Sequence, residues 1–273
     1  MIKELIKDYG KDETIKIIST ENAKSTLCFY SVLGEEYLKN KGLPFEKTPY
    51  ENVFMLNNFV RDEGFDKGLY TFQALGSVAI CDVVESGDTL LDCCSAPGGK
   101  SIRLANKFNK ITSFDIYPHR VELITAYKTR MGISNIEEKV KDASVFDESL
   151  VESFSAVLCD APCSGLGVVN DNPDIKLNRE LSSVLELTNT QFNILNTVKN
   201  YVKKGGYLYY STCSILKREN DEIIKKFIEN NKEFSVCDIT SKIECKKTEY
   251  GLQFLPHLSG GNGFYVSKLK RGE

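Results

Sequence analysis

The sequence predicts an α/β protein with a doubly wound, mostly parallel sheet, and three observations support this prediction. From Tyr70 onward, short apolar stretches typical of buried strands alternate with longer stretches whose apolar residues recur at helical spacing. Because parallel strands need crossover connections, helices between them indicate a parallel sheet. A glycine-rich turn at 97–99 separates one strand from the next helix. A second such turn, at 260–263, precedes a last apolar stretch and predicts an antiparallel edge strand.

The first 59 residues predict a small α+β segment ahead of this sheet. Its expected elements are helices over 2–18 and about 26–41 and a strand over 52–60. Glycines at 64 and 68 then mark a boundary. We therefore expect two domains, a small one over residues 1–59 and a larger one over residues 60–273.

The larger domain repeats the alternation of strand and helix. Its expected strands cover 89–93, 111–116, 135–141, 156–160, 207–212 and 264–269. Its expected helices cover 72–84, about 100–108, 118–131, 180–203 and 217–230. In such a sheet the carboxyl ends of the parallel strands share one edge, and ligands bind in the crevice there.

Composition restricts the class of protein further. The chain has 273 residues, of which 41% are hydrophobic and 27% charged, as in ordinary globular proteins. No stretch approaches 18 apolar residues, and the N-terminus lacks the apolar core of a signal peptide, so we expect a soluble, cytoplasmic protein with no membrane partner. Nine scattered cysteines without a C-x-x-C pair, and only two histidines, predict reduced thiols and no metal site.

The turn between the strand at 89–93 and its helix is a candidate ligand-binding loop. Its residues are Cys94, Ser95, Ala96, Pro97, Gly98, Gly99 and Lys100. Glycines let the backbone approach a ligand closely, and a helix N-terminus favours polar or anionic groups. Gly99-Lys100-Ser101 matches the end of a phosphate-binding P-loop, but a P-loop needs glycine where Cys94 stands. A nucleoside-containing cofactor is therefore favoured over a nucleotidase site.

Three acidic residues, Asp115, Asp142 and Asp160, follow expected strands at the same edge of the sheet. Asp115 can accept hydrogen bonds from both hydroxyls of a ribose, and Asp142 can hold an adenine amino group. Each of them alone fits a helix-capping role equally well. The three together favour a nucleoside-containing cofactor.

Two cysteines also follow strand ends on this side of the sheet. Cys163 lies in Asp160-Ala-Pro-Cys-Ser-Gly165, and Cys213 lies in Ser211-Thr-Cys-Ser214. A buried cysteine is usually inert packing. Local charge can nevertheless lower a thiol pKa below its free value of about 8.5, so this pair is a candidate for nucleophilic catalysis.

Five motifs, taken in order, resemble those of the RNA cytosine-5 methyltransferases of the RsmB/Sun (Fmu) type. They are Cys94–Lys100, Asp160–Gly165, Asn172-Pro-Asp-Ile-Lys176, Thr212-Cys213-Ser214 and Gly263–Leu269. The resemblance covers residues 60–273, and residues 1–59 resemble more weakly the small domain that precedes the catalytic one. It implies a Rossmann-like class I methyltransferase fold, S-adenosyl-L-methionine as cofactor and RNA as partner. Ribosomal RNA is the favoured substrate and transfer RNA the alternative.

The resemblance also implies catalytic roles. Cytosine carbon 5 is a poor nucleophile, and Cys213 would activate it by adding to carbon 6. Asp160 would bind the polar edge of the base and stabilise charge at ring nitrogen 3, which requires a protonated carboxyl and so a raised pKa. Cys163 would assist breakdown of the covalent adduct. Lys100 would organise the site through its ammonium group.

The same resemblance implies a set of cofactor contacts. The backbone of residues 94–100 would hold the methionine part, Asp115 the ribose and Asp142 the adenine. Arg120 would close over the ribose, and Asp160 would border the cofactor as well as the base.

Other features bear on which RNA is bound. Asn170 and Asp171 stand where members of the family commonly have arginines, and Leu177 stands where a tryptophan is common. Residues 199–273 carry 14 basic and 9 acidic side chains, and five of the basic ones are candidates for phosphate contacts: Lys199, Lys203, Lys204, Lys217 and Arg218. A catalytically silent RNA-binding or ribosome-assembly protein remains a further alternative, which the retention of both cysteines disfavours.

Overall fold

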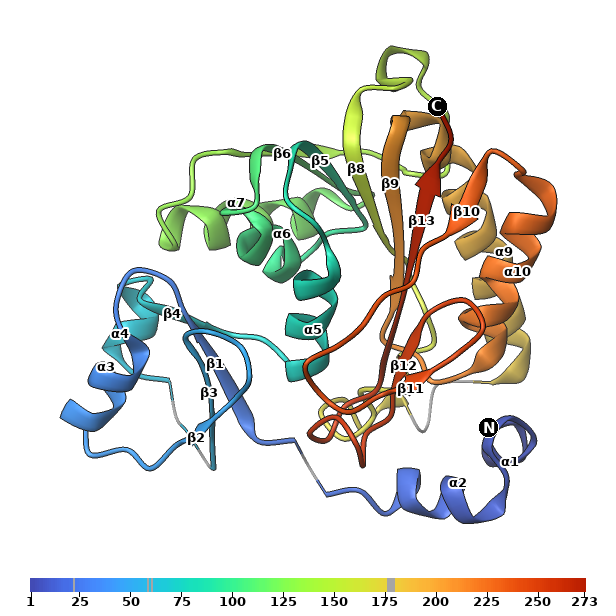
Figure 1. The fold of residues 1–273 in the computed structure, drawn as a ribbon. Helices are drawn as coiled ribbons and strands as arrows, with labels where there is room; N and C mark the ends of the chain where they lie inside the picture. The colour runs from blue at the N-terminus through green and yellow to red at the C-terminus, as the bar shows by residue number, and fades with distance from the viewer. Residues whose placement is uncertain (22, 58, 60, 176–179) are drawn as a thin grey trace.

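A large sheet forms the centre of the molecule, with helices on both of its faces and a small antiparallel sheet beside it (Figure 1). The structure is a computed structural model that describes residues 1–21, 23–57, 59, 61–175 and 180–273. Its α/β architecture confirms the predicted fold class.

The large sheet has the strand order β11-β12-β13-β9-β8-β5-β6-β7, and β10 pairs with β13. Its strands are β5 (Gly87–Cys93), β6 (Phe108–Asp115), β7 (Ile136–Val140), β8 (Phe154–Asp160), β9 (Val202–Thr212), β10 (Phe234–Val236), β11 (Lys246–Lys247), β12 (Leu252–Phe254) and β13 (Phe264–Arg271). The neighbours from β7 to β9 run parallel, and β13 runs antiparallel to β9. The predicted antiparallel strand is therefore present, but β12 and β11 extend the sheet beyond it.

Alternate residues of each strand point to opposite faces of this sheet. Both faces carry buried apolar side chains, and helices cover both of them. Leu90 and Leu158 pack on one face with α5 (Leu75–Val83), α6 (Gly99–Leu104) and α7 (Pro118–Arg130). Leu91 and Val157 pack on the other face with α9 (Leu181–Val198) and α10 (Asp221–Asn230). Three single turns complete the main domain: η1 (Glu148–Leu150), η2 (Lys199–Tyr201) and η3 (Lys217–Glu219).

The small sheet has the strand order β2-β3-β1-β4. Its elements are β1 (Ser25–Phe29), α3 (Gly34–Asn40), β2 (Glu46–Lys47), β3 (Val53–Leu56), α4 (Glu63–Asp66) and β4 (Tyr70–Phe72). The helix predicted over 26–41 is wrong in its first half, because residues 25–29 pair with β3 and β4 instead. A short apolar run of this kind suits a buried strand as well as a helix. Since β4 belongs to this sheet, we propose a domain boundary after Phe72 rather than after residue 59.

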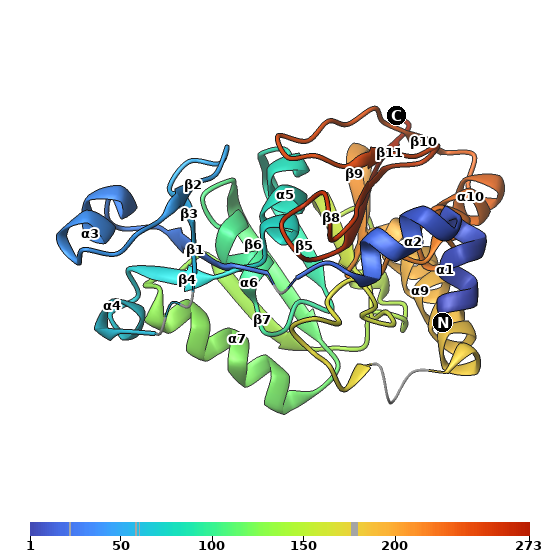
Figure 2. The same ribbon diagram turned by 90° about the horizontal axis from the view of Figure 1, so that it is seen from below.

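Two N-terminal helices, α1 (Ile2–Tyr9) and α2 (Lys11–Ile18), lie apart from the small sheet. Their buried residues Leu5 and Ile17 pack with Leu216 and Leu255 of the main domain. Figure 2 shows α1 and α2 beside α9 and α10, on the opposite side of the molecule from β1 and β3. The first 59 residues therefore contribute to two separate places on the main domain.

Two further features follow from the described residues. The helix predicted over 180–203 ends at Val198, because η2 follows it and β9 begins at Val202, with Tyr201 and Val202 fully buried. Within the described part of the chain, no helix is long and apolar enough to cross a membrane, and no three side chains of His, Cys, Asp or Glu are grouped to hold a metal ion.

Candidate active site

The candidate cofactor loop connects β5 to α6 at the carboxyl edge of the parallel strands. Two residues in it adopt positive φ, Cys94 at 58° and Gly98 at 104°. The loop folds back on itself through a 2.7 Å bond from Gly98 N to Ser95 O, and Ser95 N donates to Phe114 O of β6 at 2.8 Å. Burial raises the pKa of the Cys94 thiol to about 12, so the backbone of this residue, and not its sulfur, is suited to a ligand.

Asp115 lies directly beside this loop, at the end of β6. Its side chain is only 1% exposed and accepts a hydrogen bond of 3.3 Å from Ala96 N. Arg120 joins the two, because its Nη2 donates to Ala96 O at 3.0 Å and lies 3.5 Å from the Asp115 carboxylate. The structure therefore brings Asp115, Arg120 and the loop together.

Among the described hydrogen bonds, the Asp142 side chain takes part only in bonds within its own turn. It follows β7, and its carboxylate accepts from the backbone and hydroxyl of Ser144 at 2.8 and 2.7 Å, which caps a local turn. In the part of the chain that the structure describes, no hydrogen bond or ion pair joins Asp142 to the loop or to Asp115.

Asp160 and Lys100 form an ion pair between the cofactor loop and the cysteines. The Lys100 ammonium lies 2.6 Å from Asp160 Oδ2, and Ser211 Oγ donates to Oδ1 at 2.6 Å. Burial opposes the charge of Lys100, but the Asp160 carboxylate beside it outweighs this and raises the Lys100 pKa. Both contacts bring a donor to an oxygen of Asp160, and the protonated Asp160 expected at the catalytic step stays a prediction.

The two cysteines meet at the ends of β8 and β9, with 3.1 Å between their sulfurs. A hydrogen bond joins the two sulfurs, and with Cys163 as its donor it lowers the pKa of Cys213 and raises that of Cys163. Burial and the Asp160 charge raise the pKa of Cys213, the Lys100 ammonium lowers it, and the hydrogen bond to Cys163 is the largest of these causes, so the net pKa is lowered. The arrangement therefore favours Cys213 over Cys163 as the thiolate nucleophile.

Backbone hydrogen bonds hold the two cysteine loops together. Ala161 N donates to Ser211 O at 2.9 Å, and Gly167 N donates to Cys213 O at 2.9 Å. Gly263 N in turn donates to Gly167 O at 2.6 Å, which ties both loops to the start of β13. The positions of the sulfurs thus depend on a close three-way backbone contact.

We expect Gly167→Ala to destabilise the protein and displace Cys213. A Cβ at this position would lie 2.0 Å from the carbonyl oxygen of Gly263 and 2.8 Å from that of Cys213. Both neighbours are backbone, so the free energy of unfolding should fall by about 1–3 kcal/mol, as measured by denaturant unfolding. Gly99→Ala is the control, because nothing lies within 4 Å of its Cβ position. Equal losses in both variants would contradict this expectation.

Sequence reasoning missed two residues that shape the site. Ser211 was part of a quoted motif but had no assigned role, and it is a direct hydrogen-bond donor to Asp160. Glu219 was not singled out, yet it is fully buried and bonds to the residues after both cysteines, Ser164 and Ser214. It lies in the polar run Lys217–Glu222, which predicts a solvated helix start, so no local signal marked it.

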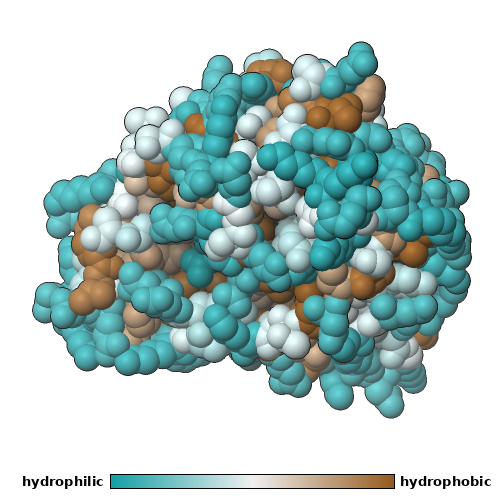
Figure 3. All heavy atoms as spheres, turned by 45° about the horizontal axis from the view of Figure 1, so that its top comes forward, coloured by the Kyte–Doolittle hydropathy of each residue, from teal (hydrophilic) through white to brown (hydrophobic). Residues whose placement is uncertain are grey.

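The five predicted phosphate contacts do not gather at the site. Lys203 and Lys204 lie at the amino end of β9, whereas Cys213 follows its carboxyl end. The other three make protein contacts: Lys199 with Glu233, Arg218 with Glu4 and the Lys217 backbone with Asp8. Figure 3 shows the amino-end side of the sheet, where hydrophilic residues predominate and apolar ones are scattered.

The structure describes only some of the motif residues at 170–177. Asn170 Nδ2 donates to Thr20 O at 3.2 Å, and Asp171 accepts from Asn262 Nδ2 at 2.8 Å. These two residues therefore fasten the loop to its neighbours. Lys176 and Leu177, which the sequence analysis also compared with the family motif, lie outside the described residues.

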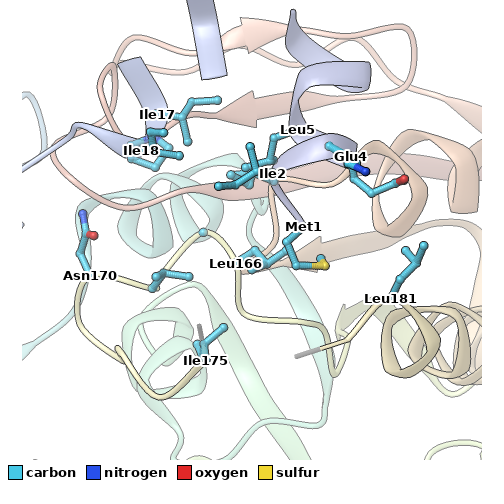
Figure 4. Close-up of a pocket in the computed structure, with 15 residues that line it drawn as sticks. Met1, Ile2, Glu4, Leu5, Ile17, Ile18, Leu166, Asn170, Ile175 and Leu181 are labelled. Carbon is cyan, nitrogen blue, oxygen red and sulfur yellow. The ribbon is translucent and has the colours of Figure 1, made fainter. Parts of the chain in front are cut away.

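An apolar cavity of about 830 Å³ is lined by Leu166 and Ile215, which follow the two cysteines in the chain, and by residues of the N-terminal helices (Figure 4). Leu5 and Ile17 from α1 and α2 face Leu166 and Ile175 across it. Residues 94–100 and Asp115 are not among its lining residues. The cavity is therefore separate from the cofactor loop.

Comparison with known proteins identifies the family. The family model described as 16S rRNA methyltransferase RsmB/F matches residues 80–270. The chain belongs to the RsmB/F family. This confirms the resemblance drawn from the five motifs.

Relatives in the RsmB/F family are longer than this chain. The protein named probable ribosomal RNA small subunit methyltransferase B of Bacillus subtilis (strain 168) is 35% identical over 219 residues, which cover 76% of this chain and 49% of that protein. Ribosomal RNA small subunit methyltransferase B of Yersinia enterocolitica is 33% identical over 211 residues, covering 76% of this chain and 48% of the relative. The chain thus spans about half the length of the curated relatives it matches.

Solved structures share the fold over the whole chain. The crystal structure of PH0851 matches with a TM-score of 0.90 and 27% identity, covering 99% of this chain and 65% of that one. The structure of NSun6 from Pyrococcus horikoshii with SFG matches with a TM-score of 0.83 and 18% identity, covering 100% and 97% of the two chains. At that identity the second match shows a common fold alone.

Proposed function

We propose that this protein transfers a methyl group from S-adenosyl-L-methionine to carbon 5 of cytosine in RNA. The observation that carries the proposal is the pair of sulfurs 3.1 Å apart, with the Lys100–Asp160 ion pair at 2.6 Å between them and the cofactor loop. Membership of the RsmB/F family supports methyl transfer to RNA. The names of the curated relatives favour ribosomal RNA over transfer RNA as the substrate.

The residues at the carboxyl ends of β5 and β6 are suited to bind the cofactor. Asp115 places a carboxylate where two ribose hydroxyls could donate to it, and Arg120 is held within reach of the same place. Gly98 gives the loop a left-handed turn, and any side chain there would press on Ile124 at 3.3 Å. When bound, S-adenosyl-L-methionine would supply an electrophilic methyl group. Asp142 would hold the adenine.

The first covalent step belongs to Cys213. Its thiolate adds to carbon 6 of cytosine, forming a carbon–sulfur bond and placing an electron pair at carbon 5. Charge develops at ring nitrogen 3, and Asp160 and Lys100 stand together at 2.6 Å to bind the polar edge of the base. A carboxyl oxygen of Asp160 would accept from the exocyclic amine, and the Lys100 ammonium would stabilise the ring. Carbon 5 would then bond the methyl carbon as the bond from that carbon to the cofactor sulfur breaks, and S-adenosylhomocysteine would leave.

Release of the product belongs to Cys163. The proton on carbon 5 must leave before the bond from Cys213 to carbon 6 can break. The hydrogen bond to Cys213 is the largest cause of the raised pKa of Cys163. Once the Cys213 sulfur is a thioether, that hydrogen bond to a thiolate no longer exists. Cys163 therefore becomes easier to deprotonate at the step that needs a base.

The experiment that tests this function is nucleoside analysis of RNA treated with the purified protein. Transcripts of small-subunit ribosomal RNA and of transfer RNA are incubated with S-adenosyl-L-methionine, digested and examined by mass spectrometry. We expect 5-methylcytidine from the ribosomal transcript. The product from transfer RNA alone would favour the alternative substrate. Binding of RNA without any methylated nucleoside would contradict the catalytic proposal and favour an assembly role.

Replacing Asp115 should separate cofactor binding from the cysteine chemistry. We expect Asp115→Ala to weaken S-adenosylhomocysteine by about 10- to 100-fold, because hydrogen bonds to a charged group are worth about 1.5–3 kcal/mol. Isothermal titration calorimetry measures this, with Asp88→Ala as the control since Asp88 contacts only Asn109 among its described hydrogen bonds. The wild-type protein should not bind ATP. Unchanged affinity in Asp115→Ala would refute the ribose contact.

A further inference from the structure

Glu219 is a buried carboxylate with no role in the chemistry above. Its exposed fraction is 0%, and among the described ion pairs none includes it. Burying a charge without a cation is unfavourable unless hydrogen bonds replace its hydration. A buried carboxylate without a neighbouring cation therefore needs several hydrogen-bond donors around its oxygens.

Four donors surround this carboxylate. Oε1 accepts from Ser164 N at 2.8 Å and from Gln191 Nε2 at 3.0 Å. Oε2 accepts from the hydroxyls of Ser164 and Ser214, each at 2.5 Å. An ionised carboxylate has about four acceptor sites, so its capacity is filled. A glutamine has a single acceptor oxygen and cannot take the same four bonds.

The donors come from the two loops that carry the cysteines. Ser164 directly follows Cys163, and Ser214 directly follows Cys213. Gln191 of α9 adds a bond of 2.9 Å to Pro162 O, the residue before Cys163. One carboxylate thus fixes both loops at the residue next to each sulfur.

The turn that holds Glu219 is itself fastened on two sides. Tyr210 of β9 donates its hydroxyl to Glu219 O at 2.6 Å. On the outer side Arg218 pairs with Glu4 of α1, and Lys217 N donates to Asp8 at 3.0 Å. The turn is therefore fastened to the sheet and to the N-terminal helix, and Asn220 adds bonds to Thr212 and Ser214 on either side of Cys213.

We propose that Glu219 is a positioning residue that holds Cys163 and Cys213 at the separation their successive roles require. The proposal rests on the two-cysteine function proposed above. Glu219 makes no described hydrogen bond to either sulfur or to the cofactor loop, and its hydrogen bonds reach the cysteine loops through Ser164, Ser214 and Gln191. Its loss should change the turnover number far more than the affinity for RNA or cofactor.

The test compares Glu219→Ala and Glu219→Gln with Asp221→Asn. Asp221 is a matched control, because it lies two residues away and its carboxylate bonds Thr248 and Tyr265 instead of the cysteine loops. We expect kcat to fall about 100-fold in Glu219→Ala, since a displacement of about 1 Å can cost that much. Glu219→Gln should fall less, because it keeps one acceptor. The KM for RNA and the affinity for S-adenosylhomocysteine should stay within about twofold in all three.

A second measurement reports the sulfur separation without any catalysis. Phenylarsine oxide binds two neighbouring thiols, as its arsenic bonds both sulfurs and one water is released. Peptide mapping should find it across Cys163 and Cys213 in the wild-type protein. In Glu219→Ala it should bind at least about tenfold more weakly, because separated thiols lose their high effective concentration. If Glu219→Ala does not fold, Glu219→Gln is measured in its place, and weaker arsenical binding there supports the proposal.

The two proposals can fail separately. A wild-type protein that captures the arsenical but methylates no cytosine would refute the proposed function and leave the positioning role supported. A wild-type protein that methylates RNA, with Glu219 variants that match it in kcat and in arsenical binding, would overturn the positioning role alone.

Discussion

Cys213→Ala is expected to abolish formation of 5-methylcytidine. Without the thiolate no bond forms to carbon 6, so carbon 5 stays a poor nucleophile and the rate should fall by at least about 10⁴-fold, as in other enzymes that lose a nucleophile. Methyl transfer to an RNA transcript, followed with labelled S-adenosyl-L-methionine, measures the loss. The affinity for S-adenosylhomocysteine should not change, because the 94–100 loop and Asp115 lie on other strands.

The matched control for this substitution is Cys237→Ala. Cys237 is half-buried after β10, which pairs with the Leu269–Arg271 end of β13, whereas Thr212 beside Cys213 pairs with Tyr265 at the other end of that strand. Its replacement should leave the rate unchanged. A Cys213→Ala protein that keeps wild-type turnover would show that the nucleophile is assigned to the wrong residue.

Cys163→Ala is expected to trap a covalent complex between protein and RNA. Cys213 can still add to cytosine and the methyl group can still be transferred, but the base 3.1 Å away that would take the carbon 5 proton is missing. Breakdown of the adduct should slow by about 10²- to 10⁴-fold, the usual contribution of a general base. A denaturing gel of the reaction mixture should show a slowly migrating protein–RNA band.

The double variant Cys163→Ala/Cys213→Ala is the control for this band. It should give none, since the sulfur that forms the bond is absent. A band of equal strength in the double variant, or none in the single one, would count against separate roles for the two cysteines. Digestion of the band with nuclease and peptide mapping should place the adduct on Cys213.

The sheet and the candidate site could be predicted because their signals are local in the chain. The strand ending at Cys93, the glycines of the next turn and Asp115 after the following strand lie within 30 residues. Parallel strands bring their carboxyl ends to one edge, so the order of Asp160, Cys163 and Cys213 along the chain implied that they meet. The 3.1 Å contact between the sulfurs agrees with that expectation.

What could not be predicted depends on long-range contacts. Residues 25–29 are apolar enough for a helix, and only pairing with β3 and β4 makes them a strand. Glu219 lies in a charged run, and its burial depends on the packing of α1 and α9 around η3. Lys203 and Lys204 add to the basic character of the C-terminal region, but the direction of β9 places them at the edge opposite the cysteines.

The most direct test of the central claim is a nucleotide-resolution map of 5-methylcytosine in total RNA from cells with and without this gene. The account predicts that a site in ribosomal RNA disappears without the gene, returns with the wild-type protein and does not return with Cys213→Ala. A map that is identical with and without the gene, or a site restored by Cys213→Ala, would contradict cytosine-5 methylation through Cys213.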